Sequence, residues 1–182
     1  LAKAVEEKSP GTRATILAYN MHALPPSIPL EDNLFVVVVP YGFNYTGYSG
    51  DDLLKLWNKK HPDRIGIYDY WSIPDWAHSM PDPDHSVKKI VNQLNFFHEA
   101  GVKALMTEST YALGTIGPLL YVYSRWVWNT DVNTEDLFSE YFRLLYGPAA
   151  GTIEAMYRRW ENDFLPSRHE VGKSYRDLEK AF

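Results

Sequence analysis

The sequence predicts an α/β fold in which four short parallel strands alternate with crossover segments and are followed by an all-helical segment. Three observations predict it. Short apolar strand candidates recur four times before residue 110, the second of them is apolar at every position from Phe35 to Val39, and the segments after residue 110 have helical patterns instead. A strand that is apolar on both faces is typical of a parallel sheet covered by helices.

The predicted strands alternate with crossovers of two kinds. The strands cover residues 14–20, 34–42, 64–71 and 102–109. The first crossover is rich in proline and too short for a full helix, so we expect a loop or short turns there. Helices are expected over 49–62, where Ser49 or Asp51 can cap the start, and over 85–101, where apolar residues recur with helical spacing.

Helices are also expected at the two ends of the chain. The later segments 117–129, 133–147 and 147–164 each have a helical pattern, and 167–182 is charged with a weaker one. Thr134 is the expected N-cap of the second of these helices and Gly147 its end. The first ten residues resemble the end of a helix whose beginning is missing, which favours a piece of a longer protein.

Composition excludes several classes of function. The net charge of −5 argues against a nucleic-acid surface or an anionic membrane surface, and no apolar run approaches the ~20 residues of a membrane-spanning helix. The chain has no cysteine, so disulfides and thiolate metal sites are absent. Its 13 Tyr, 6 Trp and 8 Phe are numerous for 182 residues, and such side chains outside a core stack well on sugars.

Polar and aromatic residues follow every predicted strand. The candidate binding residues are Tyr19, Asn20, Tyr41, Asn44, Tyr70 and Trp71, and the candidate catalytic residues are Asp69 and Glu108. In parallel α/β folds, ligands bind at the carboxyl ends of the strands, which is where these residues lie.

Asp69 and Glu108 form the sharpest predicted pair. They end consecutive strands, which lie ~4.8 Å apart if adjacent, so their carboxylates are expected to approach each other. Carboxylates about 5 Å or about 6.5–9.5 Å apart suit glycoside hydrolysis. Binding of sugar hydroxyls, binding of a divalent metal and a purely structural role are alternatives.

No cofactor or metal is predicted. The histidines and aspartates between residues 78 and 85 match no metal-ligand spacing, and the chain contains no GxGxxG, no P-loop and no GxSxG motif.

Four motifs resemble a bacterial family known only as a domain of unknown function. In chain order they are AYNMHALPPS, IYDYW, NFFHEAGVKALMTEST and DLFSEYFRLLYGPAAGTIEAMY. The resemblance covers residues 14 to about 160. YDY and YGPAA are its most specific parts, while AYN departs from the family pattern, in which an aromatic residue commonly follows the Tyr. That family is similar to the (β/α)8 barrels of β-N-acetylhexosaminidases and α-glucuronidases.

The resemblance implies the C-terminal half of a TIM-type (β/α)8 barrel over residues 1–130, with a helical extension packed on it over 131–182. From the residues alone, a small open sheet is the alternative. The implied function is carbohydrate binding, with glycoside hydrolysis as the implied activity. In the hexosaminidases a late-strand Glu binds sugar hydroxyls, whereas in the α-glucuronidases later-strand carboxylates can help activate water. A noncatalytic carbohydrate-binding module and a structural barrel fragment are the alternatives.

The resemblance also implies partners and a location. The expected partners are a carbohydrate and the remainder of the same polypeptide, the N-terminal half-barrel, or another copy of the chain. The expected location is extracellular or periplasmic.

Overall fold

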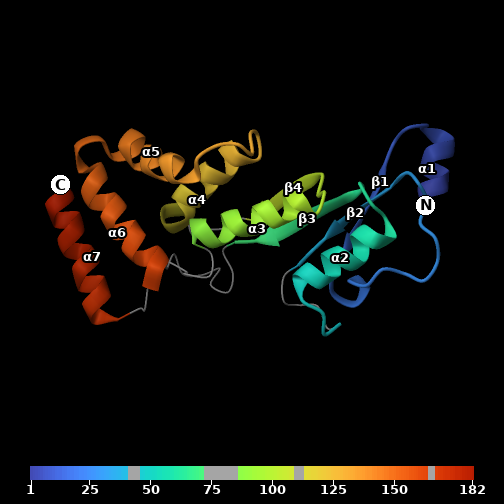
Figure 1. The fold of residues 1–182 in the computed structure, drawn as a ribbon, viewed down its shortest axis with the longest axis horizontal. Coiled ribbons are helices and arrows are strands. Elements are labelled where there is room, and N and C mark those ends of the chain that lie inside the picture. The colour runs from blue at the N-terminus through green and yellow to red at the C-terminus, as the bar shows by residue number, and fades with distance from the viewer. Residues whose placement is uncertain (41–45, 72–85, 109–112, 164–166) are drawn as a thin grey trace. The chain divides into compact units, whose positions relative to one another are not determined.

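The structure is a computed structural model that describes residues 1–40, 46–71, 86–108, 113–163 and 167–182 (Figure 1). It confirms the α/β fold, with parallel strands alternating with helices or turns and a helical segment after them. The chain divides into two compact units, a sheet unit (Leu1–Trp71 with Leu94–Glu108) and a helical unit (Ser72–Gln93 with Ser109–Phe182). The predicted division after residue 130 concerns the units of a whole barrel and stays a prediction.

The sheet unit is built on four parallel strands in chain order. They are β1 (Ala14–Ala18), β2 (Leu34–Val38), β3 (Ile65–Tyr70) and β4 (Ala104–Glu108), and the order in the sheet is β1-β2-β3-β4. Right-handed crossovers between consecutive neighbours place every connection on the same face. A doubly wound sheet instead reverses its order partway. The winding is therefore consistent with half of a (β/α)8 barrel.

The two faces of this sheet differ in burial. On one face, which we call the covered face, five side chains are at most 1% exposed: Ala18, Val36, Val38, Ile65 and Ile67. The opposite face, the open face, carries Leu17 at 55% exposed and Met106 at 53%. β2 is the most buried strand, as its unbroken apolar run predicts. The hydrophobic core of the sheet unit thus lies on the covered face.

Two helices supply the other side of that core. α2 (Gly50–Lys60) buries Leu53, Leu54 and Trp57, and α3 (Val87–Glu99) buries Leu94 and Phe97 within the same unit. The Ser49 hydroxyl accepts a hydrogen bond from the Asp52 backbone N–H at 3.1 Å, which confirms the predicted cap of α2.

The first crossover contains only a short turn, η1 (Asn20–His22), as the proline-rich sequence predicts. The indole Nε1–H of Trp57 donates to the carbonyl of Ala23 at 2.6 Å, and both residues are buried. This bond fixes the crossover against α2 directly after the end of β1.

The remaining elements are helices. They are α1 (Ala2–Lys8) in the sheet unit and α4 (Leu113–Trp126), α5 (Thr134–Tyr146), η3 (Gly147–Ala149), α6 (Ala150–Asp163) and α7 (Arg168–Ala181) in the helical unit. The predicted cap of α5 is wrong. Asn133, not Thr134, caps α5, because its side-chain oxygen accepts hydrogen bonds from the backbone N–H groups of Glu135 and Asp136 at 3.0 and 3.3 Å. Gly147 ends α5 with a φ of 52°, as predicted.

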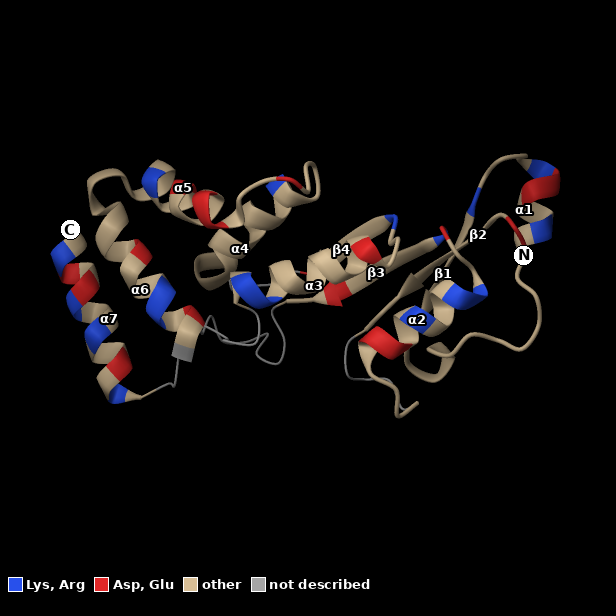
Figure 2. Cartoon of the chain, viewed as in Figure 1, with Lys and Arg blue, Asp and Glu red and all other residues tan. Residues whose placement is uncertain are grey.

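Aromatic packing and ion pairs hold the helical unit together. The ring of Phe142 lies between those of Phe138 and Tyr157, with both centroids 5.0 Å away. α6 and α7 are joined by an ion pair between Arg159 and Asp177 at 2.7 Å. Charged residues of both signs alternate along α7 (Figure 2), which explains why its helical pattern is weak in the sequence.

Candidate functional site

Four side chains from three strand ends lie together in a group that we call the tip cluster: Tyr19, Tyr68, Tyr70 and Glu108. The Tyr68 hydroxyl donates to Oε2 of Glu108 at 2.7 Å, and the rings of Tyr68 and Tyr70 meet edge to face with centroids 5.1 Å apart. Tyr19 lies beside Tyr70 and contributes to the raised pKa of Tyr70. The tip cluster lies within the sheet unit, at the carboxyl ends of β1, β3 and β4.

Strand alternation explains why these residues share one face. Tyr68 and Tyr70 are two residues apart on β3, so their side chains point to the same side of the sheet. The parallel register pairs Tyr70 with Glu108 and Tyr68 with Met106, which places Glu108 on the open face as well. Tyr19 follows β1 with the same parity as the exposed Leu17.

The electrostatics of the tip cluster keep its phenols protonated. The hydrogen bond to Glu108 raises the pKa of Tyr68 to about 12, and repulsion between a phenolate and that carboxylate adds to the effect. Burial raises the pKa of Tyr70, and the neighbouring Tyr19 raises it further. At neutral pH the cluster therefore presents hydroxyl groups that donate and accept, beside a carboxylate that accepts.

The structure does not bring Asp69 and Glu108 together. The register pairs Asp69 with Thr107, one residue out of step with the pair of Tyr70 and Glu108, so the two carboxylates lie on opposite faces of the sheet. Asp69 is 7% exposed, and its Oδ1 accepts from the backbone N–H of Tyr70 at 2.8 Å. The catalytic role expected of Asp69 stays a prediction.

The other predicted site residues have different surroundings. Asn20 adopts a left-handed backbone with φ 56°, and its buried Oδ1 has no hydrogen-bond partner among the described residues. Trp71 is 3% exposed and packs as a buried residue. Tyr41 and Asn44 lie outside the described residues.

Tyr68 belongs to the cluster although the sequence analysis did not select it. It lies inside its strand rather than at the tip, and only the side chain reaches the carboxyl end. The signal was the spacing of the two tyrosines in YDY, which places Tyr68 on the face of Tyr70.

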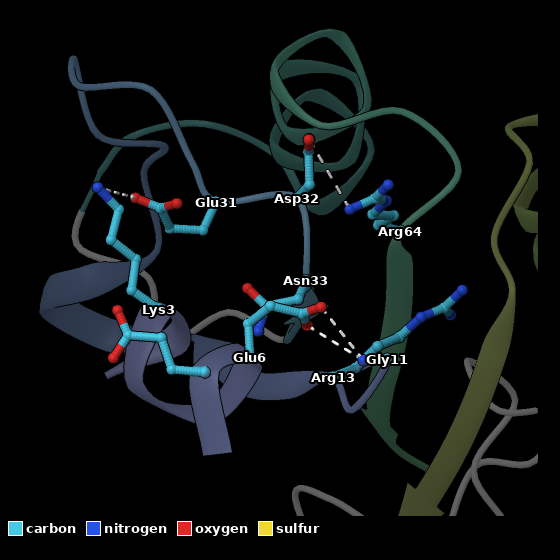
Figure 3. Close-up of a pocket in the computed structure, with 9 residues that line it drawn as sticks. Lys3, Glu6, Gly11, Arg13, Glu31, Asp32, Asn33 and Arg64 are labelled. Atoms are coloured by element: carbon cyan, nitrogen blue, oxygen red, sulfur yellow. Dashed lines mark hydrogen bonds and ion pairs between the residues drawn. The ribbon is translucent and has the colours of Figure 1, made fainter. Parts of the chain in front are cut away.

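A cavity of about 500 Å³ lies at the opposite end of the sheet, beside α1 (Figure 3). Its lining residues are Lys3, Glu6, Glu7, Gly11, Arg13, Glu31, Asp32, Asn33 and Arg64. Several of these charges pair with each other, including Lys3 with Glu31 at 3.4 Å and Arg64 with Asp32 at 4.0 Å. Because the amino ends of strands in such folds serve stability, we assign this cavity no ligand.

The described residues include neither a metal-binding cluster nor a membrane-spanning helix. Within the described ranges, no three or more His, Asp or Glu side chains are grouped so that they would hold a metal ion. None of the helices described here is both long and apolar enough to cross a membrane.

The fold and the tip cluster define a parallel α/β protein with a hydroxyl-rich candidate site at the carboxyl ends of its strands. The family model Domain of unknown function (DUF4838) matches residues 1–159, and the chain belongs to this family. No curated protein and no solved structure matches the chain. The resemblance to a domain of unknown function is thus confirmed, and the similarity of that family to glycoside hydrolase barrels stays a prediction.

Proposed function

We propose that the chain binds a carbohydrate at the tip cluster, as part of a glycoside hydrolase-like barrel that acts on a glycosidic substrate. The observation that supports this most is the hydrogen bond between Tyr68 and Glu108 at the carboxyl ends of parallel strands. Sugar hydroxyls donate and accept hydrogen bonds in turn, so a carboxylate acceptor beside phenol groups complements them. Tyrosine rings add apolar faces that stack on a sugar ring.

Hydrolysis needs a second carboxylate beside Glu108. Both retaining and inverting mechanisms place two carboxyl groups on either side of one glycosidic bond. Among the described strand residues of the open face, Glu108 is the only acid. Noncatalytic carbohydrate binding is therefore the second candidate function, and it is distinguished by saturable binding with no release of product.

Glu108→Gln tests the proposed role of the carboxylate. The amide keeps the shape of the side chain but replaces one acceptor oxygen by a donor group, so we expect affinity for the sugar that binds to fall by about tenfold, or ~1.4 kcal/mol. Isothermal titration calorimetry of the full-length protein with a panel of oligosaccharides measures the change.

The matched control is Glu99→Gln, which makes the same substitution at an exposed position of α3. Equal affinities in the two variants and the unmodified protein would remove Glu108 from the site. Assay of reducing ends in the same samples separates hydrolysis from binding alone.

A further inference from the structure

We infer that the tip cluster takes a carbohydrate without anionic groups and discriminates against uronates and sulfated sugars. This inference rests on the proposed function and specifies the substrate class of the same site. It is carried by the distribution of positive charge along the sheet unit.

The basic residues next to the strands all lie at the amino ends. Arg13 directly precedes β1, Arg64 precedes β3 and Lys103 precedes β4 (Figure 2). Lys103 is five residues from Glu108 along the chain, and a strand rises ~3.3 Å per residue, so roughly 16 Å separates the two backbone positions. Lys103 also pairs with Asp63 at 3.4 Å. None of these cations is placed to meet a ligand at the tip cluster.

The segments that follow the strands contain no Lys and no Arg. This holds for residues 19–33, 39–50, 71–86 and 109–112, read from the sequence. These segments contain five acids, of which Glu31 and Asp32 line the cavity at the amino ends of the strands, and Asp75, Asp82 and Asp84 lie outside the described residues. Their basic side chains are three histidines, His22, His78 and His85. Among the described residues, the tip cluster therefore carries the negative charge of Glu108 and contains no Lys and no Arg.

This charge distribution favours the binding of neutral sugars over anionic sugars at the tip cluster. Proteins bind carboxylates and sulfates chiefly through Arg, whose planar group donates two parallel hydrogen bonds, or through Lys. At the tip cluster a uronate would lose its hydration without gaining such a partner. It would also be repelled by Glu108, since like charges within several ångströms disfavour each other. A neutral sugar presents hydroxyls that Glu108 and the tyrosines satisfy.

Matched sugar pairs test the inference. Methyl glucoside is compared with methyl glucuronide, and methyl galactoside with methyl galacturonide, because the members of each pair differ only at C6. Calorimetry uses the full-length protein at about pH 8, where an ordinary histidine is neutral. We expect the neutral member to bind at least about tenfold more tightly, which corresponds to ~1.4 kcal/mol.

Two further measurements test whether Glu108 causes the ratio of the affinity for the neutral sugar to the affinity for the uronate. In Glu108→Gln we expect this affinity ratio to fall because the uronate binds more tightly. In Glu99→Gln we expect the ratio to stay unchanged. Raising the salt from about 0.02 to about 0.3 M also narrows the ratio in the unmodified protein, because salt screens the repulsion.

The possible failures are distinguishable. If a uronate binds as tightly as its neutral partner or more tightly, the inferred substrate class is wrong and the carbohydrate site stands. If none of the four glycosides and no oligosaccharide of the panel binds, the proposed function itself is wrong.

Discussion

At the scale of single residues, the hydrogen bond between Tyr68 and Glu108 links an uncharged donor to a carboxylate on the open face of the sheet. Because the pKa of Tyr68 is raised above its usual value, the folded state favours the protonated phenol. The stabilisation from this contact is therefore fully present below about pH 10, the ordinary pKa of tyrosine, and is lost as the pH rises through about 12.

Titration of Tyr68 gives a direct prediction. In the unmodified protein its pKa is about 12, and in Glu108→Gln it falls toward the ordinary value of about 10, because the hydrogen bond to the carboxylate is lost and the charge that repels the phenolate is gone. Carbon-13 NMR of ring-labelled tyrosine against pH measures both values. The same value for Tyr68 in both proteins would contradict the hydrogen bond.

The sequence predicted part of this site for a clear reason. Tyr19, Tyr70 and Glu108 are predicted because they stand where strands end, and the structure brings them into one cluster. The position of a residue along its strand can be predicted from the sequence. The face of the sheet on which its side chain lies depends on the register with the neighbouring strand. A shift of one residue moves a side chain to the other side of the sheet. For this reason the sequence predicts Asp69 beside Glu108 and gives Tyr68 no role in the site.

At the scale of elements, the strand types and the helix periodicity were predictable, whereas the exact ends were not. The sequence extended β1 to residue 20, but the left-handed backbone of Asn20 begins a turn there and the strand ends at Ala18. The start of α5 offered two good caps in a row, Asn133 and Thr134. The choice between them depends on whether the helix begins at Thr134 or one residue later. The spacing of apolar residues does not define the start of a helix that closely.

Alanine substitutions of Asn133 and Thr134 test which of the two residues caps α5. Asn133→Ala removes an acceptor for two backbone N–H groups at the start of α5, so we expect it to lower the free energy of unfolding by about 1 kcal/mol. Thr134→Ala places a better helix former at the first helical position and is expected to have a much smaller effect. Urea denaturation of both variants measures the difference. A larger loss in Thr134→Ala would show that Thr134 is the cap.

At the scale of the whole molecule, the sheet has one covered face, one open face and two outer strands. β1 and β4 each pair on one side only within the described sheet, and Leu17 and Met106 are exposed on the open face. Unpaired strand edges and exposed apolar side chains favour association with further strands. The predicted partner, whether the remainder of the polypeptide or another copy, would cover this face. Winding order is a property of the assembled sheet, so the sequence alone left the open sheet and the half-barrel undecided.

A matched pair of lysine substitutions tests whether the open face is covered. Leu17 is 55% exposed in β1 and Leu144 is 68% exposed in α5. If further strands cover the open face, Leu17→Lys buries a charge and lowers the free energy of unfolding of the full-length protein by about 2 kcal/mol or more. Leu144→Lys is expected to change it by less than about 0.5 kcal/mol. Thermal and urea unfolding compare the two, and equal small effects would mean that the open face meets solvent.

The central claim is that a carbohydrate binds at the carboxyl ends of the strands. A crystal structure of the full-length protein with the tightest-binding neutral oligosaccharide tests it most directly. The account predicts sugar hydroxyls within hydrogen-bonding distance of Glu108 and a sugar ring against the tyrosines of the tip cluster. A sugar bound instead in the charged cavity beside α1, at the amino ends of the strands, would contradict it.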